Sequence, residues 1–91
     1  MTEADVDADV LTPTLIRAAR GLLGFDQQEL ADKVGISRKT IALIEIMKPG
    51  PMDPRRRRIL EKLQRTMEDE LLVEFTFAGE GSGEGVRIRR K

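Results

Sequence analysis

The side chains best suited to chemistry in this sequence are cations and hydrogen-bonding groups, gathered in two short stretches. Ser37, Arg38, Lys39 and Thr40 follow one another directly, and four consecutive arginines occupy positions 55–58. Guanidinium groups match the geometry of phosphate oxygens, and arginine or lysine can donate hydrogen bonds to the edges of nucleic-acid bases. Both stretches therefore favour the binding of a polyanion.

The residue types on which many enzymes depend are missing. The 91 residues include no cysteine and no histidine, which excludes disulfides, thiolate metal sites and the commonest general base and zinc ligand. No pair of carboxylates stands apart from the other acidic residues. The sequence thus predicts a protein that is not an enzyme and that needs no metal or other cofactor.

Residues 26–45 predict two short helices around a tight turn, which would position the first cationic stretch. Asp26 is a suitable N-cap for a helix from Gln27 to Val34, and Ser37 is one for a second helix. Gly35 lies between them and can take a positive φ, so the second helix can leave at the steep angle of a helix-turn-helix. Its first turn would then reach base edges in a major groove.

The same stretch resembles the helix-turn-helix of the Cro and phage-repressor family, the xenobiotic-response-element type of bacterial transcription regulator. The matching residues are Asp26 to Ala31, Gly35 to Ser37 and Ile41 to Glu45, and the resemblance extends from about Leu15 to about Leu63. It implies a sequence-specific regulator, repressor or activator, that binds double-stranded DNA. It also implies base contacts by Ser37, Arg38, Lys39 and Leu43, and phosphate contacts by Gln27, Gln28, Thr40, Arg55 and Arg56.

Within this set, Arg38 is the first candidate for a base contact. A bidentate bond to guanine is worth about 1 to 3 kcal/mol of discrimination. Lys39 can read guanine or rest on a phosphate, and Leu43 can meet a thymine methyl group or pack inside the protein. Glu45 is expected to fix local structure, because phosphates repel a carboxylate.

Two further helices are predicted on either side of the motif. The first begins at Thr12 and Pro13 and ends near Gly24, and the second begins at Asp53 and Pro54. Arg17 and Arg20 of the first are expected on the solvated surface. The apolar stripes consist of Leu15, Ile16, Ala19, Leu22 and Leu23 in the first helix and of Ile59, Leu60, Leu63 and Met67 in the second.

The last residues predict a β-hairpin. Apolar and polar side chains alternate on both sides of a glycine-rich loop. A lone hairpin is marginal in water, so its apolar side chains need a partner surface, either the chain's own helices or a second copy of the hairpin. We expect a homodimer, because two-fold symmetry would place two reading helices about 34 Å apart on DNA. Its interface would consist of Val73, Phe75, Phe77, Val86 and Ile88.

An alternative function is a protein-interaction module, such as an antitoxin or antiactivator. In that case the hairpin binds a different protein, and DNA binding serves only autoregulation. The sequence leaves the identity of such a protein open.

Charge is segregated along a chain whose net charge is zero. Residues 1–10 carry −4, residues 11–67 carry 12 − 6 = +6, residues 68–84 carry −6 and residues 85–91 carry +4. The basic middle agrees with DNA binding. The acidic start is expected to be a solvated tail, with competition against phosphates for the basic face as its functional alternative.

The sequence therefore predicts a mostly α fold. A disordered acidic tail (1–11) precedes a four-helix repressor-like helix-turn-helix domain (12–70), and a C-terminal β-hairpin (71–91) follows. No apolar run reaches the roughly 20 residues that span a bilayer, so we expect a cytoplasmic protein without membrane contact.

Overall fold

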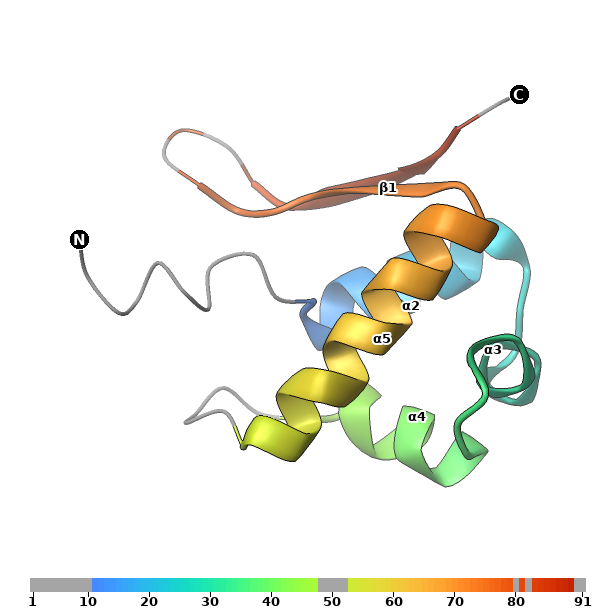
Figure 1. Cartoon of the computed structure of the whole chain (residues 1–91). Helices are drawn as coiled ribbons and strands as arrows, with labels where there is room; N and C mark the ends of the chain where they lie inside the picture. Colours follow the sequence, from blue (N-terminus) through green and yellow to red (C-terminus); the bar gives the residue numbers. More distant parts are fainter. Residues whose placement is uncertain (1–10, 48–52, 80, 82, 90–91) are drawn as a thin grey trace.

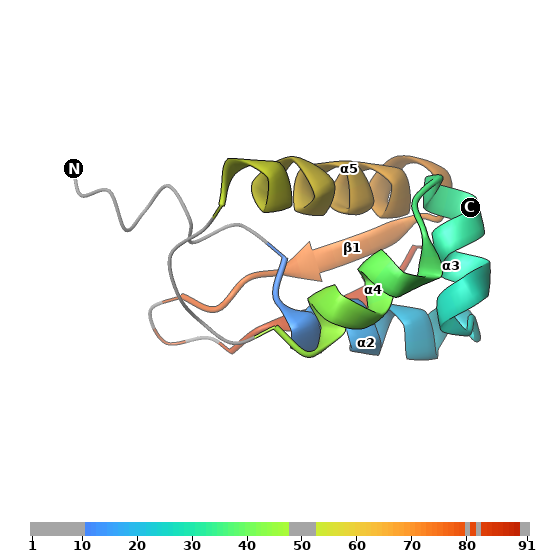
Figure 2. The same cartoon turned by 90° about the horizontal axis from the view of Figure 1, so that it is seen from below.

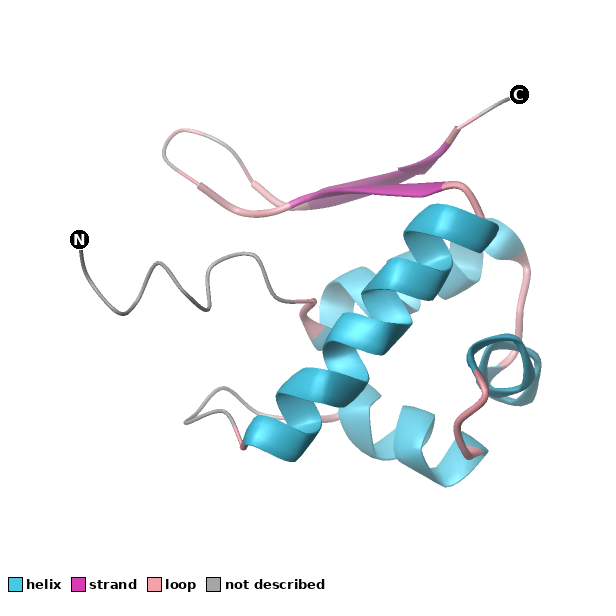
Figure 3. Ribbon diagram, in the orientation of Figure 1, coloured by secondary structure: helices cyan, strands magenta, loops and turns pink. Residues whose placement is uncertain are grey.

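The computed structural model describes residues 11–47, 53–79, 81 and 83–89 of the chain (Figure 1). Their order is α2 (Pro13–Leu23), α3 (Gln27–Val34), α4 (Arg38–Glu45), α5 (Pro54–Glu70), β1 (Val73–Thr76) and β2 (Gly85–Ile88) (Figure 3). The predicted mostly α fold, with four helices before a C-terminal hairpin, is confirmed. Residues 1–10 of the predicted tail and residues 48–52, which precede α5, lie outside the described residues. None of the described helices has the length and apolarity needed to cross a bilayer.

Local capping signals set the helix boundaries. Thr12, Asp26, Ser37 and Asp53 are the N-caps of the four helices, and each side chain accepts a hydrogen bond from a backbone N–H two or three residues later. Gly35 ends α3 with a φ of 83°, a conformation that strains a residue with a Cβ atom. The chain can therefore turn sharply from α3 into α4.

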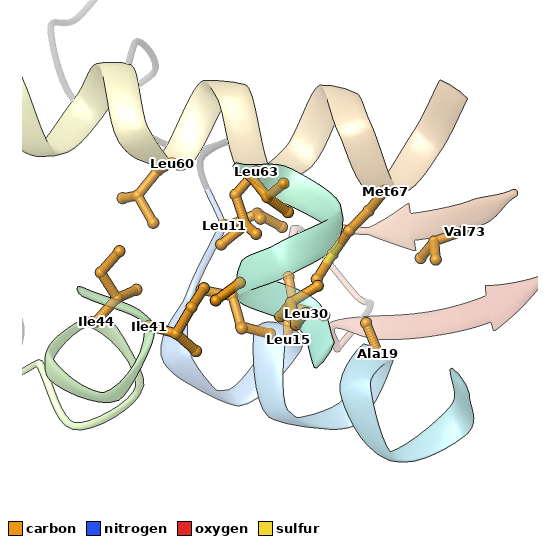
Figure 4. Packing of buried hydrophobic residues seen from close by; sticks show 13 residues of the cluster. Leu11, Leu15, Ala19, Leu30, Ile41, Ile44, Leu60, Leu63, Met67 and Val73 are labelled. Carbon is orange, nitrogen blue, oxygen red and sulfur yellow. The ribbon is translucent and has the colours of Figure 1, made fainter. Parts of the chain in front are cut away.

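The core fills the space between the helices and continues under the hairpin (Figure 4). Leu11, assigned to the acidic tail from the sequence, is only 2% exposed and lies near Leu15 and Leu63, so it belongs to the core. Leu22 of the predicted α2 stripe is instead 56% exposed. The buried face of α2 is centred on Leu15 and Ala19, and Leu22 lies at its rim.

The hairpin packs on the helices of its own chain. β1 and β2 are antiparallel, with Val73 opposite Ile88 and Phe75 opposite Val86. Their apolar side chains lie against the core, β2 contacts α2, and β1 contacts α5 (Figure 2). Val73 is 1% exposed and therefore has no surface to offer a second chain. The other predicted interface residues, Phe75, Phe77, Val86 and Ile88, are half-buried.

Two features of this arrangement matter for the site. The hairpin and α4 lie on opposite sides of the molecule, with α2 and α5 between them (Figures 1 and 2). The Thr12 hydroxyl donates a hydrogen bond to the Glu84 carboxylate at 3.1 Å, which ties the end of the hairpin loop to the start of α2. The hairpin, as far as residue 89, consequently leaves the outer face of α4 uncovered.

Candidate nucleic-acid interface

The first turn of α4 is exposed on the side away from the hairpin. Residues 37–39 are exposed, and Leu43, one turn later, is 58% exposed. Of the two alternatives for Leu43, packing inside the protein is therefore excluded. Ile41 and Ile44 on the opposite side of α4 are buried, which fixes the orientation of the helix.

An ion pair between the buried Glu45 and the partly exposed Arg20 anchors the other end of α4 to α2. Glu45 is 2% exposed, and its two carboxylate oxygens accept hydrogen bonds from Arg20 Nε at 2.8 Å and Arg20 Nη2 at 2.9 Å. Arg17 donates to the backbone carbonyl of Glu45. The prediction that Glu45 fixes local structure is confirmed. The expectation of a solvated Arg20 is wrong, because its guanidinium group is held between the two helices by this carboxylate.

Both members of the pair are stabilised in their charged forms. Burial raises the pKa of Glu45, but hydrogen bonds from Arg20 and Gln27, together with nearby positive charge, outweigh burial, and the pKa lies below the ordinary value of 4.5. The hydrogen bond to Glu45 raises the pKa of Arg20, against the opposing effect of burial. The pair is therefore fully ionised at neutral pH.

Gln27 connects this buried pair to the exposed start of α4. Its Nε2 donates to Glu45 Oε1 at 3.1 Å, which sets the orientation of the amide group. The amide Oε1 then accepts a hydrogen bond from Arg38 Nη1 at 3.2 Å. An amide nitrogen carries two hydrogens, so Gln27 can donate a second bond to an anion. We call these residues the Glu45–Gln27–Arg38 chain.

A groove of about 290 Å³ runs between α4 and the start of α5. It brings together four residues that the sequence predicted at the DNA surface: Thr40, Leu43, Arg55 and Arg56. Ile44, Asp53 and Ile59 complete its lining, so exposed guanidinium groups stand beside an apolar wall. We call it the α4–α5 groove. Arg58 instead lines a separate depression with Lys62 and Arg65 on α5.

Three more of the predicted contact residues, besides Gln27 and Arg38, have partners within the chain. Gln28 Nε2 donates to Asp32 Oδ1 at 2.8 Å. Ser37 Oγ accepts the N-cap bond from the Thr40 backbone at 3.1 Å and lies 2.8 Å from Thr40 Oγ1. Among the described residues, no group of three or more acidic side chains is arranged to hold a metal ion.

Sequence reasoning missed the role of Arg20. The residue lies 25 positions before Glu45, and a pair so far apart produces no periodic signal. Gln27 was singled out for its place at a helix start, whereas its bonds to Glu45 and Arg38 depend on how α3 and α4 cross.

Helices α3 and α4 are joined at a glycine of positive φ, and the first turn of α4 is exposed and cationic, which is the arrangement of a DNA-binding helix-turn-helix protein. A family model for helix-turn-helix proteins matches residues 16–69, more than half of the chain. The chain thus belongs to the helix-turn-helix family of the Cro and phage-repressor type and is a DNA-binding transcription regulator. No curated protein gives a significant match to the sequence.

Proposed function

We propose that this regulator recognises a specific double-stranded DNA sequence as a homodimer, with the first turn of α4 in the major groove. The observation that carries the proposal is the Glu45–Gln27–Arg38 chain, which holds an exposed guanidinium group at the start of α4. A side chain held in place before binding loses less conformational entropy when it bonds a guanine. Arg38 is therefore assigned as the main base reader, with Ser37, Lys39 and Leu43 beside it.

The proposed phosphate contacts lie on two sides of α4. At the start of α3, the second amide hydrogen of Gln27 adds to the partial positive charge of the helix N-terminus. Gln28 must exchange its bond to Asp32 for one to a phosphate. In the α4–α5 groove, Thr40, Arg55 and Arg56 can follow a single DNA strand while Leu43 turns toward the bases.

The test compares Arg38→Ala with Arg55→Ala on a site selected from random duplex DNA and on single-base variants of that site. Arg38→Ala should relax the preference at one base pair by about tenfold, because it removes a bidentate base contact. Arg55→Ala should weaken binding to all sequences alike and lower the salt slope by about 0.9, because it removes a phosphate contact.

Two further variants make this test sharper. Gln27→Ala should relax the preference at the same base pair as Arg38→Ala but by a smaller factor. Arg65→Ala removes an exposed charge outside the α4–α5 groove and should leave sequence preference intact. An unchanged preference in Arg38→Ala would remove Arg38 from its assigned role.

A second candidate function, the binding of another protein by the hairpin, is favoured by the open edge of β1. Arg89 N donates to Leu72 O at 2.7 Å, so by alternation the backbone groups of Val73 and Phe75 point away from β2. A groove of about 510 Å³ runs along this strand and is also lined by Glu68 and Asp69 of α5. An extended segment of another protein could pair there. A double variant, Arg38→Ala with Arg55→Ala, would keep this function and lose operator binding.

A further inference from the structure

Residues 3–10 have an alternating pattern that suits a specific kind of surface. Glu3, Asp5, Asp7 and Asp9 occupy the odd positions, and Ala4, Val6, Ala8 and Val10 occupy the even ones. In an extended chain, successive side chains point to opposite sides. Such a segment would present four carboxylates on one side and four small apolar groups on the other.

The α4–α5 groove has the complementary character. Arg55 and Arg56 supply two exposed positive charges against the single negative charge of Asp53, whose carboxylate accepts a hydrogen bond from the Arg55 backbone N–H, and Leu43, Ile44 and Ile59 form the apolar wall. The surrounding part of α5, residues 54–65, contains six basic residues and one acidic residue, 6 − 1 = +5, against −4 for residues 1–10. The α4–α5 groove and residues 3–10 therefore have opposite net charge, and both offer apolar surface.

The chain enters the core close enough to the groove for this contact. Leu11 lies near Leu63 of α5 (Figure 4), and Leu63 is eight residues from Arg55, about 12 Å along the helix axis. Eight extended residues span about 26 Å. Residues 3–10 can thus reach the start of α5 without any rearrangement of Leu11.

We propose that residues 3–10 bind in the α4–α5 groove of their own chain, and that DNA must displace them before its phosphates reach Arg55 and Arg56. This inference rests on the proposed function, because the groove is the same one assigned to the DNA backbone. The segment competes for phosphate contacts and not for bases. Bound in the groove, the segment reduces the apparent DNA affinity equally for every sequence. The apparent affinity is the intrinsic affinity multiplied by the fraction of molecules whose groove is open.

The experiment uses the full chain and two charge-matched variants. The first is Asp5→Asn/Asp7→Asn/Asp9→Asn, and the second is Glu61→Gln/Asp69→Asn/Glu70→Gln, with three exposed acids on α5 outside the groove. Both raise the net charge from 0 to +3. At about 50 mM salt the first should bind duplex DNA about fivefold more tightly than wild type, and the second less than about twofold. The difference in DNA affinity between the two variants should vanish at about 0.5 M salt, because salt screens the charges.

A second measurement does not depend on DNA. The NMR signals of the Arg55 and Arg56 Nε–H groups should move in the first variant and stay in place in the second. Equal gains in DNA affinity for both variants, or unmoved arginine signals, overturn the inference. A shift that depends on protein concentration would indicate the segment of a second copy and would also overturn it. If no variant binds DNA at any salt concentration, the proposed function fails, and the arginine signals alone decide the docking.

Discussion

At the scale of single residues, Glu45 is a carboxylate buried at the end of the helix that is assigned to read DNA. Burying a charge is unfavourable, and a buried ion pair contributes little beyond what apolar packing would. Removing one partner is different, because it leaves the other charge buried and unpaired. Arg20 thus keeps Glu45 ionised, and Glu45 in turn orients Gln27 and Arg38.

Arg20→Ala should lower the free energy of unfolding at pH 7 by about 3 kcal/mol, the lower end of the range seen when one partner of a buried pair is removed, because Arg20 itself is partly exposed. The pKa of Glu45 is lowered in the folded state, so its contribution to stability is complete above the pKa of the unfolded chain. That contribution is lost as the pH falls through the folded pKa. The difference in free energy of unfolding between wild type and Arg20→Ala should therefore narrow below pH 4.5, the ordinary pKa of a glutamate.

Urea denaturation at pH 7 and at several lower pH values measures this gap. Arg65→Ala, an exposed arginine on α5, is the control and should cost less than about 0.5 kcal/mol at every pH. A gap for Arg20→Ala that stays constant with pH would contradict the assignment of a charged pair.

The backbone of Leu72 is held in a left-handed conformation, which should cost the folded protein stability. Its φ is 60°, and no other residue with a side chain has a positive φ in the described ranges. Leu71 beside it is also half-buried but has a φ of −106°. Leu72→Gly relieves the backbone, whereas Leu71→Gly removes a side chain that packs against the core. Leu72→Gly should therefore be less destabilising than Leu71→Gly by about 1 kcal/mol or more in thermal unfolding, and equal losses would show that Leu72 is unstrained.

At the scale of elements, α5 carries its charges in the order that its own dipole disfavours. Four arginines occupy its positive N-terminal end, and Glu68, Asp69 and Glu70 occupy its negative C-terminal end. A helix selected only for stability would carry acidic residues at its N-terminal end and basic residues at its C-terminal end. The arginine run is thus better explained by binding to an anion than by folding.

Arg56→Gln should raise the free energy of unfolding by about 0.3 to 1 kcal/mol, because it removes a cation from the first turn of α5. The same change should weaken DNA binding. Arg65→Gln, in the middle of the helix, should have neither effect. Thermal unfolding and DNA titration on the same samples measure both quantities, and a less stable Arg56→Gln would contradict the explanation from the helix dipole.

The elements also show which parts of the structure the sequence could predict. Helix starts were predictable because Thr12, Asp26 and Ser37 each cap a helix by accepting a hydrogen bond from the backbone three positions later. The burial of Leu11 and the exposure of Leu22 were not, because both depend on where α5 and the hairpin lie. In the site, exposure of residues 37–39 followed from the helix period, whereas the partners of Arg20 and Gln27 depend on helix crossing.

At the scale of the whole molecule, the position of the hairpin restricts how two copies can bind one DNA. The hairpin lies on the side opposite α4 (Figure 1), so stacking two hairpins face to face would direct the two α4 helices away from each other. If the two copies instead lie side by side, related by a two-fold axis that runs in the direction from hairpin to α4, both α4 helices face the same side of the dimer. In the proposed dimer, contact would come from the parts of Phe75, Phe77, Val86 and Ile88 that the chain's own core leaves exposed.

Phe75→Asp should shift the protein from dimer to monomer in sedimentation at micromolar concentration, because it places a charge in that contact. Leu22→Asp, at the exposed apolar residue of α2, is the matched control and should sediment as wild type. Circular dichroism must show an intact helical fold in both variants. A wild type that is already monomeric at this concentration rejects the dimer.

The bond between Thr12 and Glu84 joins positions 72 residues apart and has a consequence for synthesis of the protein. The hairpin that packs against α2 leaves the ribosome after the four helices, so a nascent chain can form α3 and α4 while the contact surface of α2 still lacks its cover. The α2 surface can be covered only after β2 (Gly85–Ile88) has been synthesised. A premature stop before residue 84 would therefore leave apolar surface of α2 available to chaperones and proteases instead of a shorter working regulator.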